Sequence, residues 1–258
     1  MNTHPSFPQR DQEPAPAGVR EEIDLTIFIP CFNEESRVVP TLETVRAALG
    51  ELGLSYEVIA VDDGSTDRTA EVIAEFCRAN PDMPVRLHKN PRNLGLSRSF
   101  VDTAFRGRGR YYRLVCGDNV EPKDSMVKIL SAIGKADIII PYYPVLPGKS
   151  ASRKFISRLY TRIVDLLGGY KINYYNGCAL YRRFHVMRWA SYNYGFGFQA
   201  HLITTLLDEH ATYVQVPLEG FHLTKDRGSP LNTRNFLSTG HTLWEIFIRR
   251  LRRTIYGN

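Results

Sequence analysis

Two adjacent carboxylates, Asp62 and Asp63, follow directly on the apolar run 56–61. Like charges side by side are unfavourable without a partner, so a plain turn does not account for the pair. The Ser-Thr-Asp run at 65–67 has good helix-capping residues, which predict that a helix starts there. A carboxylate in this place is able to accept hydrogen bonds from a nucleotide base or from ribose hydroxyls. The pair therefore predicts a nucleoside site.

Polar residues also follow the apolar run 25–30, where Asn33 and Glu34 belong to the segment PCFNEE. Asn-Glu before a helix is often only a cap. Further along the chain, Asn93 and Gly95 form a turn that opens another predicted helix. Backbone N–H groups at a helix start are able to bind a diphosphate, and a plain turn accounts for them equally well.

Another carboxylate, Asp118, lies in the segment CGDNVEP (116–122), at the end of another apolar run. One carboxylate at a strand end suits a divalent cation, Mg²⁺ or Mn²⁺, that is shared between the protein and a diphosphate. Such a cation neutralises the charge that grows on a leaving nucleoside diphosphate. The sequence therefore predicts a metal ligand at Asp118.

The elements that position these residues alternate between strands and helices. Apolar, β-rich runs predict strands at 25–30, 56–61, 85–89, 111–116 and 136–141. Helical spacing of apolar residues predicts helices at 37–52, 66–76, 96–105 and 125–133. Strands that are apolar throughout indicate a mainly parallel sheet with both faces covered. Ligands of such sheets lie beyond the carboxyl ends of the strands, at the loops 30–36, 62–67, 90–95 and 117–122.

The second half of the chain is less regular. Its patterns predict helices at 152–167, 198–209 and about 235–254, a strand at 212–217 and a strand-like end to 176–183. The segment 1–22 is polar and rich in proline, and we expect a disordered tail there.

Composition narrows the class of protein. The 258 residues carry a net charge of +6, and 43% of them are hydrophobic, which excludes a mostly disordered chain. The four cysteines form no CxxC pair, which argues against a disulfide scaffold or a cysteine zinc site and fits a reducing compartment. No run approaches the roughly 20 apolar residues of a spanning helix. We therefore expect a soluble or peripheral intracellular protein.

In this order and spacing, PCFNEE, VDDGSTDRT, the Asn-x-Gly turn and the acidic motif after the fourth strand resemble the family-two glycosyltransferases. The resemblance implies an α/β fold of the GT-A (Rossmann-like) type. The second half is similar to the polyprenyl-phosphate (dolichyl-phosphate) mannose or glucose synthases, in SRKFISRLY, NYYNGCALYRR and VPLEGFHLTKDRGS. The resemblance then implies a GT-A domain over 23–235, with a nucleotide-sugar half at about 23–145 and an acceptor half at about 146–235.

The resemblance also assigns roles to residues. The nucleotide pocket would be lined by Pro30, Phe32, Glu34, Val61 and Asp63, together with the neighbouring Asp62. Asp118 would be the catalytic metal ligand, with Gly117 beside the sugar diphosphate. The acceptor phosphate would be placed by Arg153, His222, Lys225 and Arg227, of which Arg153 and Arg227 act in catalysis. The implied reaction is inverting transfer of a hexose from a GDP- or UDP-sugar to polyprenyl phosphate.

Three residues depart from the family pattern. Cys116 replaces the first Asp of the usual Asp-x-Asp, Val120 replaces a Gln, and Asn173 replaces the Asp of the acceptor loop. The metal site is weaker unless Glu121 or Asn119 contributes. A phosphate acceptor is already anionic, since its second pKa is about 6, so it needs cations more than a general base. The loss of a carboxylate at Asn173 therefore favours a phosphate acceptor over a hydroxyl.

Positive charge gathers on two amphipathic helices, 152–167 and the C-terminal segment 236–258, where four arginines lie within 249–253. Basic amphipathic helices suit the interface of an anionic membrane, and the alternative is that both apolar faces pack on the core. We expect a peripheral position on the cytoplasmic face, with a membrane subunit or homo-oligomer as further options. Nucleic acid is a poor partner, because no recognised module is present.

Two other functions stay open from the sequence. A glycosyltransferase with a sugar-hydroxyl acceptor would need a base such as Glu121 or Asp124. A non-catalytic nucleotide-binding partner subunit is suggested by Cys116 and Asn173.

Overall fold

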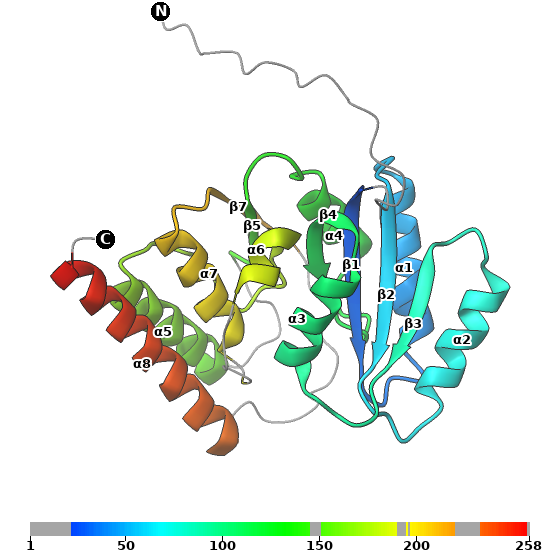
Figure 1. The fold of residues 1–258 in the computed structure, drawn as a ribbon, viewed down its shortest axis with the longest axis horizontal. Helices are drawn as coiled ribbons and strands as arrows, with labels where there is room; N and C mark the ends of the chain where they lie inside the picture. The colour runs from blue at the N-terminus through cyan, green and yellow to red at the C-terminus, as the bar shows by residue number, and fades with distance from the viewer. Residues whose placement is uncertain (1–21, 145–150, 190–194, 196, 220–232, 257–258) are drawn as a thin grey trace, which may run out of the picture.

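The computed structural model describes residues 22–144, 151–189, 195, 197–219 and 233–256, and a single seven-stranded sheet runs through them (Figure 1). The strands are β1 (Ile23–Cys31), β2 (Tyr56–Asp62), β3 (Val85–Lys89), β4 (Gly109–Leu114), β5 (Ile138–Tyr142), β6 (Leu180–Arg182) and β7 (Tyr213–Pro217). The helices are α1 (Val38–Gly50), α2 (Thr69–Ala79), α3 (Leu96–Arg106), α4 (Lys123–Leu130), α5 (Ala151–Gly168), α6 (Arg183–Arg188), α7 (Phe198–Asp208) and α8 (Thr233–Tyr256).

The sheet has the strand order β3-β2-β1-β4-β6-β5-β7. All neighbouring pairs are parallel except the two that involve β6, which runs antiparallel to both β4 and β5. The predicted mainly parallel sheet is therefore confirmed. In consequence, the ligand edge of the sheet carries the carboxyl ends of six strands and the amino end of β6.

Alternate residues of the strands feed two hydrophobic clusters, one on each face of the sheet. Ile27 and Ile29 of β1 join a cluster that α1, α2 and α4 complete. Phe28, between them, joins a second cluster formed with α3 and α7. Residues that alternate in a strand point to opposite faces, so the two clusters show directly that helices cover both sides.

Two predicted boundaries at the ligand edge were wrong. Helix α2 begins at Thr69 rather than at residue 66, because the Ser-Thr-Asp run at 65–67 bonds to the loop after β1 instead of extending the helix. Strand β4 ends at Leu114, which leaves Cys116 in the loop that follows. The short helix α6 did not appear among the predicted elements.

Helices α5 and α8 lie side by side at the end of the sheet opposite to β3 (Figure 1). Helix α8 is anchored to α7 by Arg249 and Arg253, which both donate to the carboxylate of Asp208. Its opposite side is exposed and apolar, with Trp244, Phe247, Leu251 and Ile255 at helical spacing. Among the helices in the described ranges, none has the length and apolarity that a membrane span requires.

A buried imidazole lies beneath this anchor. His201 of α7 is 9% exposed, and its Nδ1 accepts a hydrogen bond of 3.0 Å from Trp189 Nε1. Burial, and then the Arg249 cation, lowers the pKa of His201 from 6.5 to about 4. The folded protein therefore holds this ring neutral, and a proton on Nδ1 would break the bond to Trp189.

This geometry predicts that folding stability falls with acid below pH 6.5. The unfolded chain takes up the proton of His201 near pH 6.5, whereas the folded chain does so only near pH 4. The loss at pH 4.5 should be on the order of 2–3 kcal/mol, measured by urea unfolding at several pH values. His201→Gln should flatten the slope between pH 6.5 and 4.5, whereas His210→Gln, at an exposed position just after α7, should keep it. An unchanged slope in His201→Gln would contradict this account.

Candidate active site at the carboxyl edge of the sheet

The central strands bring several predicted site residues to one edge. Pro30 of β1 is in register with Val61 of β2, and Cys31 is in register with Asp62. Gly117 lies on the other side of β1, since a Cβ on it would stand 2.8 Å from the carbonyl oxygen of Pro30. Glycine is therefore required for the loop after β4 to pass this close. The predicted nucleotide and diphosphate residues meet at this edge.

The loops after β1 and β2 are joined by reciprocal hydrogen bonds. Asn33, with a φ of +56°, accepts at Oδ1 from the backbone N–H of Thr66 (2.9 Å), and its own N–H donates to Ser65 Oγ (3.0 Å). The N–H of Glu34 donates to Thr69 Oγ1 (2.8 Å). The polar residues of both motifs thus fix each other, and this fixes where Glu34 enters the site.

Asp63 holds the third loop in place. Its carboxylate accepts from Asn90 Nδ2 (2.6 Å), from the backbone N–H groups of Leu94 (3.0 Å) and Gly95 (2.9 Å), and from Ser99 Oγ (3.2 Å). The expectation that N–H groups of this turn meet a diphosphate is therefore wrong for Leu94 and Gly95. Direct contact between Asp63 and a nucleoside stays a prediction.

The remaining predicted nucleotide residues differ in exposure. Asp62 accepts at Oδ1 from the N–H of Ser65 (3.0 Å), while Phe32 is 47% exposed beside it in the loop after β1. The side chain of Val61 is buried in the core with Phe28, so a ligand at this position meets backbone. The geometry therefore keeps Asp62 and Phe32 at the edge and draws Val61 inward.

The edge is electrostatically negative around the end of β1. Burial raises the pKa of the Cys31 thiol, and so do the nearby carboxylates. These belong to Glu34, Asp62 and Asp67. A cluster of carboxylates favours ligands that bring hydroxyl or N–H donors, which fits a ribose or a base better than a phosphate.

Asp118 is half-buried in the loop after β4 and supplies the hard oxygen that Mg²⁺ and Mn²⁺ prefer. The two residues considered as substitute ligands have other partners. Asn119 accepts from Thr44 Oγ1 (3.0 Å), and Glu121 pairs with Arg113 (2.6 Å). Within the described ranges, no group of three His, Cys, Asp or Glu residues could hold a metal. Asp118 therefore fits as the protein carboxylate that would hold such a cation.

The half of the chain that was predicted to bind the acceptor, about 146–235, is described in part. Arg153 lies half-buried in the first turn of α5, and Asn173 donates through its backbone and side chain to Gln215 Oε1. The predicted phosphate-binding residues His222, Lys225 and Arg227 lie outside the described residues.

A comparison with protein families bears on this edge. The sequence profile described as Glycosyl transferase family 2 matches residues 26–189, which is well over half of the chain. The chain belongs to glycosyl transferase family 2. The family-two match begins in β1 and ends just after α6, so it contains every loop of the edge described above.

The relatives of this family-two chain include two proteins whose names contain a lipid phosphate. It is 25% identical over 224 residues to a dolichyl-phosphate beta-glucosyltransferase of Trichomonas vaginalis. The aligned region covers 77% of this chain and 64% of the relative. The chain is 32% identical over 166 residues to a dodecaprenyl-phosphate galacturonate synthase of Rhizobium johnstonii, which covers 62% and 47%. The chain therefore spans less than two thirds of the length of either relative.

A solved structure confirms the fold of the family-two chain. Glucosyl-3-phosphoglycerate synthase from Mycobacterium tuberculosis, in complex with Mn²⁺, UDP and glucosyl-3-phosphoglycerate, superposes with a TM-score of 0.64. The match covers 87% of this chain and 80% of the other at 17% identity. The expectation of a GT-A fold is confirmed.

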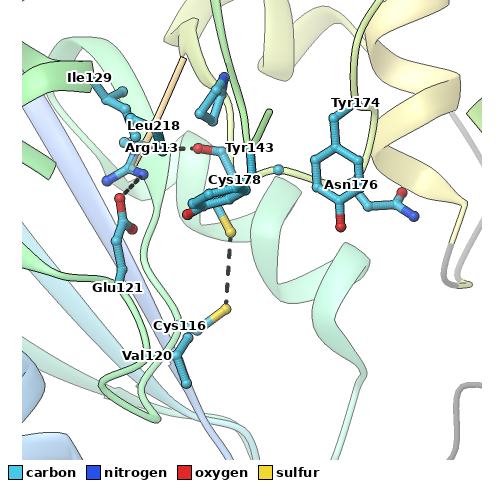
Figure 2. Close-up of a pocket in the computed structure, with 12 residues that line it drawn as sticks. Arg113, Cys116, Val120, Glu121, Ile129, Tyr143, Tyr174, Asn176, Cys178 and Leu218 are labelled. Carbon is cyan, nitrogen blue, oxygen red and sulfur yellow. Dashed lines mark hydrogen bonds and ion pairs between the residues drawn. The ribbon is translucent and has the colours of Figure 1, made fainter. Parts of the chain in front are cut away.

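The sequence did not predict a cavity that lies next to this edge. A cavity of about 160 Å³ opens between the ends of β4, β5 and β6 (Figure 2). Its polar lining includes Arg113 and Glu121, and the thiols of Cys116 and Cys178 face each other there at 4.0 Å. The signal was present in YYRLVC, where one arginine interrupts an apolar strand.

The adjacent aspartates offer a matched test of the edge. Asp63→Ala removes the acceptor of four internal donors and should lower the free energy of unfolding by about 3 kcal/mol. Asp62→Ala removes one internal hydrogen bond and should cost about 1 kcal/mol. Urea unfolding followed by circular dichroism measures both. Equal losses in the two variants would show that Asp63 does not hold the third loop.

Proposed function

We propose that the chain transfers a hexose, of glucose or mannose type, from a GDP- or UDP-sugar to polyprenyl phosphate with inversion. The observation that carries the proposal is that Asp62 and the loop with Asp118 lie on either side of the end of β1, at one edge of a family-two fold. The acceptor follows from the names of the two relatives, which both contain a polyprenyl-type phosphate. Glucose and galacturonate both occur in those names, so family membership alone leaves the sugar open.

In the proposed reaction, the loops after β1 and β2 bind the nucleoside through Glu34, Asp62 and, less directly, Asp63. Asp118 would hold Mg²⁺ or Mn²⁺, and the cation would neutralise the charge that grows on the leaving diphosphate. Arg153, with Arg227 and the residues His222 and Lys225 of the same segment, holds the acceptor phosphate. A phosphate oxygen then attacks the anomeric carbon from the face opposite the leaving diphosphate, so the configuration inverts.

The environment of the candidate bases favours a phosphate acceptor over a sugar hydroxyl. A hydroxyl must lose its proton, and the bases considered for that step were Glu121 and Asp124. Glu121 is paired with the guanidinium of Arg113, and Asp124 is 92% exposed on α4. The ion pair occupies Glu121, and the exposure of Asp124 places it in solvent, whereas a phosphate acceptor needs no general base.

The proposal predicts that Asp118→Asn loses at least about 100-fold in transfer rate, because several kcal/mol of charge stabilisation depend on this carboxylate. The assay mixes protein, Mn²⁺, short polyprenyl phosphate and labelled nucleotide sugars, and counts label in the organic phase. Asp124→Asn, a matched change at an exposed position, should keep wild-type activity. Near-normal transfer by Asp118→Asn would remove its metal role. Nucleotide binding without transfer from any donor would favour the partner-subunit function.

We further propose that α5 and α8 attach the protein to the cytoplasmic face of a membrane. Besides the apolar side of α8, α5 exposes Phe155, Ile156 and Leu159, and exposed arginines flank both helices. An exposed apolar stripe with adjacent basic residues suits the interface of an anionic bilayer. This position would bring a lipid-borne phosphate close to Arg153, which begins the same helix.

Vesicle binding tests this attachment. Trp244→Ser removes a side chain that is 61% exposed on α8 and should weaken binding to vesicles of anionic lipid about tenfold. Phe105→Ser, on α3, removes an aromatic ring that is 58% exposed and should have no effect. Cosedimentation with phosphatidylglycerol vesicles gives the partition coefficients. Equal effects of both substitutions would argue against a membrane role for α8.

A further inference from the structure

The cavity between β4, β5 and β6 lies next to the proposed donor site along the ligand edge of the sheet. Cys116 and Val120, which line it, stand two residues before and two residues after Asp118. The nucleoside loops lie at β1 and β2, the predicted diphosphate site lies after β4, and the cavity comes next in the strand order. A nucleotide sugar laid along the edge from β2 towards β5 would therefore place its sugar at this cavity.

An arginine at the base of the cavity has one hydrogen-bonding group left over. Arg113 is 1% exposed, its Nη2 pairs with Glu121 Oε1 at 2.6 Å, and its Nε donates to the carbonyl of Cys178 at 3.2 Å (Figure 2). Its Nη1 is buried and has no partner among the described residues. A buried N–H group is costly to leave without an acceptor, so this atom points to an oxygen supplied by a ligand.

The lining of the cavity carries no net charge. Glu121 balances Arg113, and the other polar side chains of the lining are phenols, thiols and the amide of Asn176. Burial raises the pKa of Tyr174 to about 12 and also raises that of Tyr143, so both phenols stay protonated. An anionic ligand would meet the carboxylate of Glu121, and a cationic one would meet the guanidinium of Arg113. A neutral ligand with hydroxyl groups suits both.

From these observations we infer that the cavity binds the sugar ring of the donor, that the ring is a neutral hexose, and that the Arg113–Glu121 pair determines this specificity. Arg113 Nη1 donates to a ring hydroxyl, and Glu121 excludes sugars that carry a carboxylate. The inference rests on the proposed function in one respect only, because it needs a nucleotide-sugar donor and makes no use of the lipid acceptor.

Titration calorimetry in the presence of Mn²⁺ tests whether the charge of the Arg113–Glu121 pair determines which donor sugars bind. The ligands are UDP and GDP, then UDP-glucose against UDP-glucuronate and GDP-mannose against GDP-mannuronate. The wild-type protein should bind the neutral sugar of the accepted nucleotide at least tenfold more tightly than its uronate. Glu121→Gln leaves an oxygen for Arg113 but removes the negative charge, so the preference should shift towards the uronate by tenfold or more. Glu51→Gln, an exposed acid paired with Lys123, should leave the preference unchanged.

A second variant tests the same inference if Glu121→Gln fails to fold. Arg113→Met with Glu121→Leu replaces the buried pair by apolar side chains of similar size, a kind of exchange that proteins often tolerate. It should bind the nucleoside diphosphate within threefold of wild type and lose the discrimination between hexose and uronate.

The outcomes separate this inference from the proposed function. Unchanged discrimination in both variants, with nucleoside diphosphate still bound, would overturn the sugar site. Selective binding of a neutral donor that is never transferred to lipid would support the sugar site and overturn the acceptor. If the wild-type protein binds neither UDP nor GDP, the proposed function and the sugar site fail together.

Discussion

The candidate site depends on the residue Asp63, where three loops are joined. Its backbone N–H donates to the carbonyl of Cys31 at the end of β1, and its carboxylate gathers four donors from the 90–99 segment. One buried charge therefore fixes the loops after β1, β2 and β3 against each other. Buried carboxylates are stable only when such donors surround them, so the three loops form as a unit.

The two ends of the site differ in their local charge. Around Cys31 the carboxylates of Glu34, Asp62 and Asp67 concentrate negative charge, which suits the donor groups of a nucleoside. Beyond β4, Arg113 and Glu121 cancel each other inside a largely apolar cavity. Asp118 stands between these two regions, where the proposed diphosphate would bring its own negative charge and a cation would be needed.

The strands and the parallel sheet were predictable because apolar runs and their order are local features of the sequence. The position of Asp118 at a strand end followed from the same pattern. The role of Asp63 in holding the third loop was not predictable, since its donors lie 27 to 36 residues away. The start of α2 was misplaced for the same reason, because the residues at 65–67 bond across to the loop after β1. Arg113 was overlooked because a charge within an apolar strand shows its partner only in three dimensions.

Because β6 runs in the opposite direction to its neighbours, the two ends of the ligand edge are able to change independently in evolution. In the other strands the ligand edge is reached by the loop that follows the strand, but at β6 it is reached by the segment that precedes it, residues 174–178. Within that segment, Cys178 contacts Arg113 and Cys116, which belong to β4 and to the loop after it. Mutations there alter the cavity while the opposite end of the edge keeps its internal bonds. The antiparallel strand thus separates the cavity from the loops that Asp63 joins. Evolution is therefore able to change the residues of one region while those of the other stay the same.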